Sequence, residues 1–230
     1  MTQACHIVFP LYDGVTQLDF TAPHQFFNRM PGAVTTVASV GGADVEADGL
    51  VFTRLADLSA VERCDVLCVP GGFGTTAAML DDTFMAVIRR LGGEARYVTS
   101  VCTGSLILAA AGLLEGRRAA CHWAWRDLLP LFGVEVDEAR VSRDGPVITG
   151  GGVTAGLDFA LVAGAEIFGE DAAGAVQLGL EYSPAPPFVG GRPEEAPPHI
   201  LSQVSARMAL AVEDRRAAAQ EAARRLRARG

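Results

Sequence analysis

Cys102 has the sequence setting of a nucleophile. It stands between a short apolar run, 97–101, and a helix-favouring run over 103–111. A thiol at such a strand-to-helix corner faces unpaired backbone N–H groups and the positive end of the helix dipole, which favour the thiolate. A corner this tight also strains the cysteine backbone and turns the sulfur outward. The alternative is a small buried hydrophobe, because most cysteines take that role.

A thiolate nucleophile needs a group that manages protons. Asp19 follows the first apolar run and opens a helical run, so it is either a proton partner or a helix N-cap or first-turn acid, and the residues alone favour the second, structural role. His122 lies 20 residues after Cys102. It suits a Cys–His dyad or, equally well, a histidine held by a backbone carbonyl. Thr103 adds a hydroxyl and a backbone N–H directly after the cysteine.

Two glycine clusters follow apolar runs, at 70–75 (PGGFGT) and 150–156 (GGGVTAG). Glycine lets the backbone turn its N–H groups toward a ligand, as in an anion-binding nest. A plain tight turn between a strand and a helix is the alternative. The spacing of the first cluster does not fit a dinucleotide-binding fingerprint.

The composition excludes several chemistries. The chain of 230 residues contains no lysine, and all 19 basic residues are arginine. Lysine Schiff bases, pyridoxal phosphate attachment and a Walker-type phosphate loop are therefore excluded. The net charge of −8 argues against a general nucleic-acid binder. With five cysteines, no secretory signal and no apolar run long enough for a bilayer, we expect a cytoplasmic protein without a disulfide framework or metal site.

Short apolar runs alternate with helical runs through the first 170 residues, which predicts a flavodoxin-like, doubly wound α/β sandwich with a mostly parallel sheet. In such sheets functional groups gather beyond the carboxyl ends of the strands, where Asp19, the glycines at 71–74 and Cys102 all fall. Strands are expected at 5–11, 34–39, 66–69, 97–101, 118–121, 134–136 and 147–149, a hairpin at 41–49, and helices at 19–29, 84–92, 103–111, 124–131 and 155–168.

The last part of the chain differs in composition. Six of the 12 prolines fall within residues 183–199, which predicts a long connection. Residues 200–229 have helical spacing, with seven arginines and three acidic residues from Arg207 onward. We interpret them as an amphipathic helix with a solvated basic face rather than a DNA-binding segment. The chain is thus expected to form one domain over 1–230, with a core of about 182 residues and a C-terminal helical extension.

Several motifs occur together along the chain: 17–24 (QLDFTAPH), 70–72 (PGG), 97–105 (YVTSVCTGS), 122–124 (HWA), 149–156 (TGGGVTAG) and 180–188 (LEYSPAPPF). Their combination resembles the PfpI-type superfamily of glutamine-amidotransferase-like α/β proteins and, within it, the bacterial isocyanide hydratases. Thr103 stands where protease-like members have a histidine, and Asp19 where many relatives have a glutamate; both agree with the hydratase pattern.

The resemblance implies hydration of an isocyanide, R–N≡C, to an N-substituted formamide without a metal or organic cofactor. Cys102 is then the nucleophile, Asp19 the general acid/base, and Thr103 the group that orients water or substrate. Backbone donors for the substrate are expected at Gly72, Thr103 and Gly151. A homodimer is also implied, with the connection or the C-terminal helix at its interface. The candidate residues for an apolar substrate pocket are Phe20, Phe73, His122, Trp123 and Val153.

Two other functions stay open at this point. One is a hydrolase of the same superfamily that converts α-oxoaldehydes to hydroxy acids. The other is a redox or ligand sensor without turnover, because an exposed thiol of low pKa oxidises readily. Similar domains are fused to helix-turn-helix modules in some regulators, and we expect the roughly 30 residues after the connection to be too few for such a module.

Overall fold

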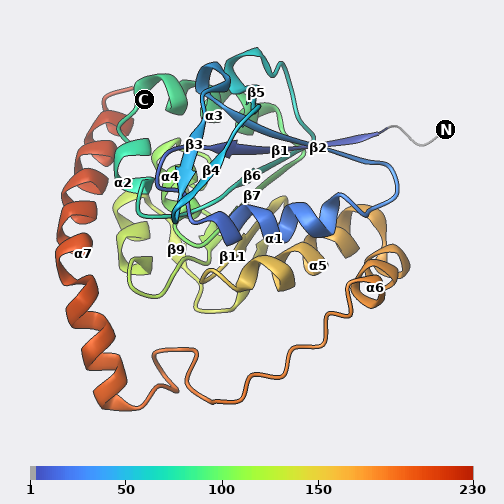
Figure 1. The fold of residues 1–230 in the computed structure, drawn as a ribbon. Helices are drawn as coiled ribbons and strands as arrows, with labels where there is room; N and C mark the ends of the chain where they lie inside the picture. The colour runs from blue at the N-terminus through green and yellow to red at the C-terminus, as the bar shows by residue number, and fades with distance from the viewer. Residues whose placement is uncertain (1–3, 230) are drawn as a thin grey trace.

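The computed structural model describes residues 4–229 as a central sheet between two layers of helices (Figure 1). All neighbouring strands are parallel except the antiparallel pair at one edge, β10 and β11. The predicted flavodoxin-like, mostly parallel sandwich is confirmed. In order across the sheet, the strands are β10 (Val141–Asp144), β11 (Val147–Gly150), β7 (Tyr97–Val101), β6 (Val66–Val69), β1 (Cys5–Leu11), β2 (Ala33–Ser39) and β5 (Ala56–Asp57).

Each face of the sheet carries its own apolar core. Phe27 and Phe159 pack between the sheet and the first helical layer, whereas Leu106 and Ile107 belong to the core on the other face. The first layer contains α1 (Gln17–Phe27), α5 (Ala155–Phe168) and α6 (Glu170–Gly179); the second contains α2 (Thr75–Ala78), α3 (Asp82–Glu94), α4 (Gly104–Ala110), the 3₁₀ helix η3 (Arg126–Phe132) and α7 (Pro198–Arg227).

The remaining elements are short. A hairpin is present, but its strands β3 (Val45–Ala47) and β4 (Leu50–Phe52) extend beyond the expected range of 41–49. The strands β8 (Arg118–Ala119) and β9 (Glu135–Val136) pair outside the main sheet. Two more 3₁₀ helices are η1 (Val40–Gly42) and η2 (Leu58–Ala60). The α-helix expected at 124–131 is the 3₁₀ helix η3 instead. Its Pro130 has no N–H to donate, which disfavours a regular α-helix there.

The parallel register brings four strand ends to one edge of the sheet. Val69 at the end of β6 is paired with Ser100 of β7, and Gly150 at the end of β11 is paired with Val101. The turns that follow β1, β6, β7 and β11 therefore meet at this edge, as expected for a doubly wound sheet.

A long connection leads from α6 to α7, and α7 then runs along the side of the molecule against α2, α4 and η3 (Figure 1). Two α7 arginines are bound to carboxylates of the chain itself, Arg216 to Asp127 and Arg225 to Glu221, and Arg229, just after the helix, is bound to Asp82. Within residues 4–229, no helix combines the length and apolar character needed to cross a membrane.

Candidate active site

Cys102 occupies a strained corner between β7 and α4. Its φ of 58° lies in the left-handed region, which is unfavourable for a residue with a side chain. The corner is held by a hydrogen bond of 3.1 Å from the Cys102 N–H to the Gly150 carbonyl. It also requires Gly104, because a Cβ there would lie 2.0 Å from the Val69 carbonyl oxygen. The strained elbow predicted from the sequence is present, with the cysteine only 3% exposed.

Asp19 is fully buried in the first turn of α1, and its carboxyl interacts with the Cys102 thiol. Its Oδ2 accepts a 3.0 Å hydrogen bond from the Gly71 N–H, on the turn after β6. Its Oδ1 has no nitrogen or oxygen partner among the described residues. Asp19 is thus a first-turn acid, as one form of the structural alternative expects, but its carboxyl caps no N–H of α1. One carboxyl oxygen is anchored to the turn after β6, and the other has no such anchor.

Gly71 makes this arrangement possible because it has no side chain. A Cβ at this position would lie 2.4 Å from the Thr103 nitrogen, 2.6 Å from Thr103 Oγ1 and 3.0 Å from Asp19 Oδ2. The backbone of the β6 turn is thus in contact with both the elbow and the carboxylate.

Thr103 is tied into a hydrogen-bond network behind the elbow. Its Oγ1 accepts from the Gly72 N–H at 3.0 Å and lies 2.9 Å from Thr75 Oγ1 and 3.3 Å from the Gly72 carbonyl oxygen. Thr75 Oγ1 lies 3.0 Å from the hydroxyl of Tyr12, which donates to the Pro70 carbonyl at 2.8 Å. Each hydroxyl has one proton to give, so the Thr103 proton stays within this network. This network holds the hydroxyl in place, and the expected role of Thr103 in orienting water or substrate stays a prediction.

Two of the three expected backbone donors are already in use. The Gly72 N–H is bound to Thr103, and the Gly151 N–H donates to the Arg140 carbonyl at 2.9 Å. The expectation that they bind substrate is corrected accordingly. The Thr103 N–H instead interacts with the Cys102 sulfur and lowers its pKa.

The thiol and the carboxyl are electrostatically coupled. Burial raises the pKa of Asp19 to about 7, although the hydrogen bonds from Gly71 and Cys102 oppose the rise. Burial and the Asp19 charge raise the pKa of Cys102 well above its ordinary value, against the smaller effect of the Thr103 N–H. The sequence predicts that the helix N-terminus favours the thiolate, but burial and the Asp19 charge outweigh this effect and favour the thiol. Near neutral pH the pair holds one or two protons and titrates as a unit.

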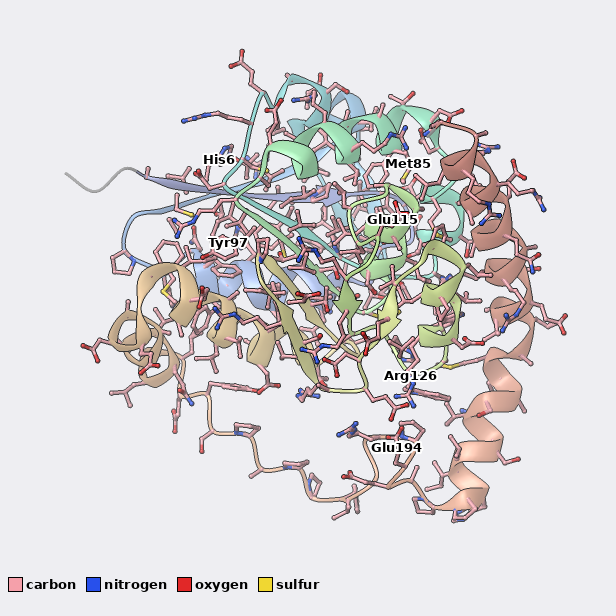
Figure 2. The ribbon with its side chains drawn as sticks, turned by 180° about the vertical axis from the view of Figure 1, so that it is seen from behind. His6, Met85, Tyr97, Glu115, Arg126 and Glu194 are labelled. Carbon is pink, nitrogen blue, oxygen red and sulfur yellow. The ribbon has the colours of Figure 1, made fainter. Side chains whose placement is uncertain are left out.

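A cavity of about 240 Å³ lies beside the turn that follows β11. Among the described residues, its lining does not include Cys102, but it includes Gly151, the neighbour of the Gly150 carbonyl that holds the elbow. Figure 2 shows Arg126 and Glu194 facing each other at this side of the molecule, from η3 and the long connection, with 2.8 Å between Nη2 and Oε1. The cavity thus has side chains from both the sheet edge and the connection. Its lining includes Cys121, His122, Trp123, Gly151, Val153, Arg126, Glu138, Arg140 and Arg192.

Of the expected pocket residues, His122, Trp123 and Val153 line this cavity and two others do not. Phe20 is buried against Phe52, with 4.9 Å between ring centroids, because its side of α1 faces the apolar core. Phe73 is 62% exposed and touches Trp125 edge-on. Neither is among the described residues that line the cavity.

His122 is held as a neutral imidazole. Its Nδ1 accepts from the Ala124 N–H at 3.2 Å, and its ring stacks on Trp123. Burial and the charge of Arg215 lower its pKa to about 4. Among the described residues the ring makes no hydrogen bond to Cys102, so the Cys–His dyad is not formed. The ring is held by the backbone, as the alternative expects, but by the Ala124 N–H and not by a carbonyl.

Arg215 of α7 was not expected at the site. It is 1% exposed and reaches the carbonyls of Gly72 and Phe73. The sequence does contain a signal for its burial. It shares the spacing of the small residues on the buried side of α7, which are Ala218, Ala219, Ala222 and Ala223.

Comparisons with known proteins agree with this geometry. The DJ-1/PfpI family profile matches residues 5–165. Isonitrile hydratase of Pseudomonas putida is 44% identical over 226 residues, covering 97% of this chain and 98% of the relative. The HTH-type transcriptional regulator CdhR of Pseudomonas aeruginosa is 31% identical over 171 residues, which are 73% of this chain and 48% of the regulator.

Among solved structures, a THiJ/PfpI family protein from Pseudomonas syringae superimposes with a TM-score of 0.91 at 40% identity, over 94% of this chain and 90% of the other. The family profile covers the elbow, Asp19 and the glycine turn. The full-length likeness to the hydratase extends beyond the profile to the connection and α7. The chain therefore belongs to the DJ-1/PfpI family.

Proposed function

We propose that this protein hydrates isocyanides to N-substituted formamides, with Cys102 as the nucleophile and Asp19 as its acid and base. The observation that carries the proposal is the buried pair of a strained thiol and a carboxyl whose pKa is raised to about 7. A group with such a pKa can both give and take a proton near neutral pH. The likeness to the isonitrile (isocyanide) hydratase of Pseudomonas putida supports the same reaction.

In the first half of the reaction, the reactive form of the pair is the Cys102 thiolate beside the protonated Asp19 carboxyl. The sulfur attacks the terminal carbon of R–N≡C and forms a C–S bond. That carbon takes the proton of Asp19, which becomes a carboxylate. The product of this half is a thioimidate, R–N=CH–S, bound to the enzyme.

In the second half, water adds to the thioimidate carbon. The Asp19 carboxylate accepts a proton from the water and passes it to the nitrogen, giving R–NH–CH(OH)–S. The C–S bond then breaks, the hydroxyl proton returns to Asp19, and the thiolate departs. The released product is R–NH–CHO. One proton of water ends on the nitrogen, and the other restores the Asp19 proton that was used on carbon.

The shape of the site favours a slender electrophile. Cys102 is only 3% exposed, and the terminal carbon of an isocyanide is a one-atom tip on a linear group. The N-substituent would lie in the neighbouring cavity of about 240 Å³, against Trp123 and Val153. The planar, branched head of an α-oxoaldehyde is broader, so the structure favours the isocyanide over this alternative.

The remaining features of the proposal concern organisation. We place the protein in the cytoplasm as a single domain and as a homodimer, without a metal, an organic cofactor or a nucleic-acid partner. Large apolar side chains are exposed on the connection, at Phe188 and Val189, and on α7, at Leu210, which supports an interface there. The carboxylate pairs of the α7 arginines and of Arg229 support the absence of a nucleic-acid partner.

The proposal is tested by incubating the purified protein with a panel of isocyanides that differ in the size of the N-substituent, and measuring formamide. We expect turnover by the wild type and none by Cys102→Ala. Glyoxal substrates in a parallel assay report hydroxy-acid formation. Hydroxy acid without formamide would replace the proposal by the α-oxoaldehyde hydrolase.

A further inference from the structure

Arg215 is a buried cation that the reaction described above does not use. We propose that it is a positioning residue of this site, which fixes the Gly72–Phe73 turn and supplies the positive charge that balances the Cys102 thiolate. The inference rests on the proposed function for its catalytic meaning. Its structural basis is independent of which electrophile the thiol attacks.

The guanidinium is held by groups that carry no negative charge. Its Nη2 donates to the Gly72 carbonyl at 2.8 Å and to the Phe73 carbonyl at 3.0 Å, and its Nε donates to Thr76 Oγ1 at 3.1 Å. The carbon Cζ lies 4.4 Å from the ring centroid of Trp125, which is a cation–π contact. Among the described residues, no carboxylate forms an ion pair with it, and its buried Nη1 has no hydrogen-bond partner.

A buried charge without a counter-ion is costly, so the groups around it decide what it does. The titratable groups whose charge interacts with that of Arg215 are Tyr12, Cys102, Cys121 and His122. Asp19 in turn interacts with Cys102. Tyr12 donates its proton to the Pro70 carbonyl, and burial raises its pKa. Cys121 is buried as well, which raises its pKa to about 11.

Of these groups, Cys102 is the one that the chemistry must charge. The guanidinium is placed beside the elbow by Gly72, which it contacts and which also binds Thr103. Burial lowers the pKa of Arg215 and the Cys102 charge opposes that shift, so the same attraction favours the thiolate. It therefore favours thiolate beside protonated carboxyl over thiol beside carboxylate. That arrangement is the one from which the sulfur attacks.

The same side chain also holds the turn that carries the site. Gly72 accepts from Arg215 with its carbonyl and donates to Thr103 with its N–H, and the preceding Gly71 donates to Asp19. Gly72 thus links the arginine to Thr103, and Gly71 and Gly72 together link it to Asp19. Loss of the two bonds from Nη2 would leave these carbonyls only longer contacts and would allow the turn to shift. The Gly72 carbonyl would keep the Thr75 N–H and Thr103 Oγ1 at 3.3 Å, and the Phe73 carbonyl the Thr76 N–H at 3.5 Å.

The test compares Arg215→Gln, Arg215→Lys and the control Arg216→Gln. Glutamine removes the charge and keeps an N–H donor, whereas lysine keeps the charge. Arg216 is the neighbouring arginine on α7, is partly exposed and binds Asp127. The readout is the rate of alkylation of Cys102 by iodoacetamide between pH 5 and 10, followed by peptide mass. This readout needs no isocyanide, and kcat and KM for formamide formation are measured separately.

For Arg215→Gln we expect alkylation at pH 7.5 to fall about tenfold, which corresponds to about one pH unit in thiolate formation. Arg215→Lys should retain the wild-type pH profile with a several-fold lower kcat, and Arg216→Gln should match the wild type in both. If Arg215→Gln does not fold, Arg215→Met replaces it, because its apolar chain fills the place of the arginine stem.

A folded Arg215→Gln or Arg215→Met with the wild-type alkylation profile would overturn the charge role. So would an Arg215→Lys whose profile shifts as far as that of the glutamine variant. A wild-type kcat in Arg215→Lys would overturn the role in holding the turn. Wild-type protein that forms no formamide, but whose alkylation profile shifts as expected on substitution, would contradict the proposed reaction and leave Arg215 as the counter-charge of the thiol.

Discussion

The elbow around Cys102 and the rim of the cavity (the Arg126–Glu194 ion pair) are held in place in different ways. At the elbow, Cys102 and Asp19 are buried and are held by backbone groups, and the nearby Gly71 leaves no room for a side chain. At the rim, Arg126 and Glu194 form an ion pair of partly exposed side chains between η3 and the connection. The elbow is thus held by backbone contacts in the interior, whereas the rim is held by contacts between partly exposed side chains.

This difference teaches where the chemistry and the selectivity reside. Backbone contacts in a close-packed interior fix reacting atoms accurately, and small changes there are felt at once. Exposed ion pairs contribute little energy and rearrange readily. We therefore expect elbow substitutions to affect kcat strongly and rim substitutions to affect mainly the choice of N-substituent. The following changes test this contrast.

Asp19→Asn removes the acid and base but keeps the size of the side chain. We expect kcat to fall by about 10²- to 10⁴-fold, the usual contribution of general acid–base catalysis. Formamide formation under saturating isocyanide measures it. Asp13→Asn is the matched control, since this carboxylate is exposed on the turn after β1 and should leave kcat unchanged. Equal activity of Asp19→Asn and the wild type would show that the proton comes from another group.

Gly71→Ala places a Cβ against Thr103 and Asp19, so the turn must move. We expect a loss of about 100-fold in kcat, because a displacement near 1 Å can have that effect. The control is Gly93→Ala in α3, where a Cβ meets no atom within 4 Å and alanine favours the helix. If both variants turned over like the wild type, the close packing of the elbow would not be needed for the reaction.

The pH dependence of stability should reveal the buried carboxyl. The pKa of Asp19 in the folded protein, about 7, lies above its ordinary value of 3.8. The folded protein therefore retains a proton that the unfolded chain releases, and this contribution to stability is lost as pH rises from about 4 to about 7. The unfolding free energy of the wild type, relative to Asp19→Asn, should fall by up to about 1.4 kcal/mol per pH unit in this window.

Urea unfolding of both proteins from pH 4 to 8 measures this difference. A difference that rises with pH instead would mean that Asp19 is stabilised as a carboxylate in the fold. The conclusion that the fold favours the protonated Asp19 carboxyl would then be wrong.

Glu194→Gln breaks the rim pair with Arg126, which retains Glu138 as a second partner. We expect less than about a threefold change in KM for a bulky isocyanide and no change in kcat, as exposed pairs are worth at most about 1 kcal/mol. Arg224→Gln on the far end of α7 serves as the control for loss of an exposed ion pair. A tenfold fall in kcat for Glu194→Gln would place the rim within the catalytic machinery.

Local patterns were sufficient to predict much of the fold. Strands β1, β6 and β7 and helix α5 begin and end where the sequence indicates, because continuous apolar runs and glycine turns are local signals. The edge strand β10 (VSRD) was not expected, since its polar sequence lacks such a signal. Its pairing depends on the neighbouring β11.

The site could be predicted only in part. The Cys102 corner is a local feature, whereas the role of Asp19 depends on Gly71, 52 residues away, and the role of Arg215 depends on Gly72, 143 residues away. The N–H groups of Gly72 and Gly151 were expected to be free, but contacts distant in sequence occupy them. Phe20 was placed in the pocket because spacing alone does not tell which side of α1 faces the core.

The central claim is covalent catalysis at Cys102, and mass spectrometry of quenched protein tests it most directly. The wild type, mixed with excess isocyanide and quenched in acid within milliseconds, should gain the mass of one isocyanide. Peptide mapping should locate this mass at Cys102, and formamide should follow at the rate at which the adduct decays. Formamide production with an unmodified Cys102, or undiminished in Cys102→Ala, would contradict the account.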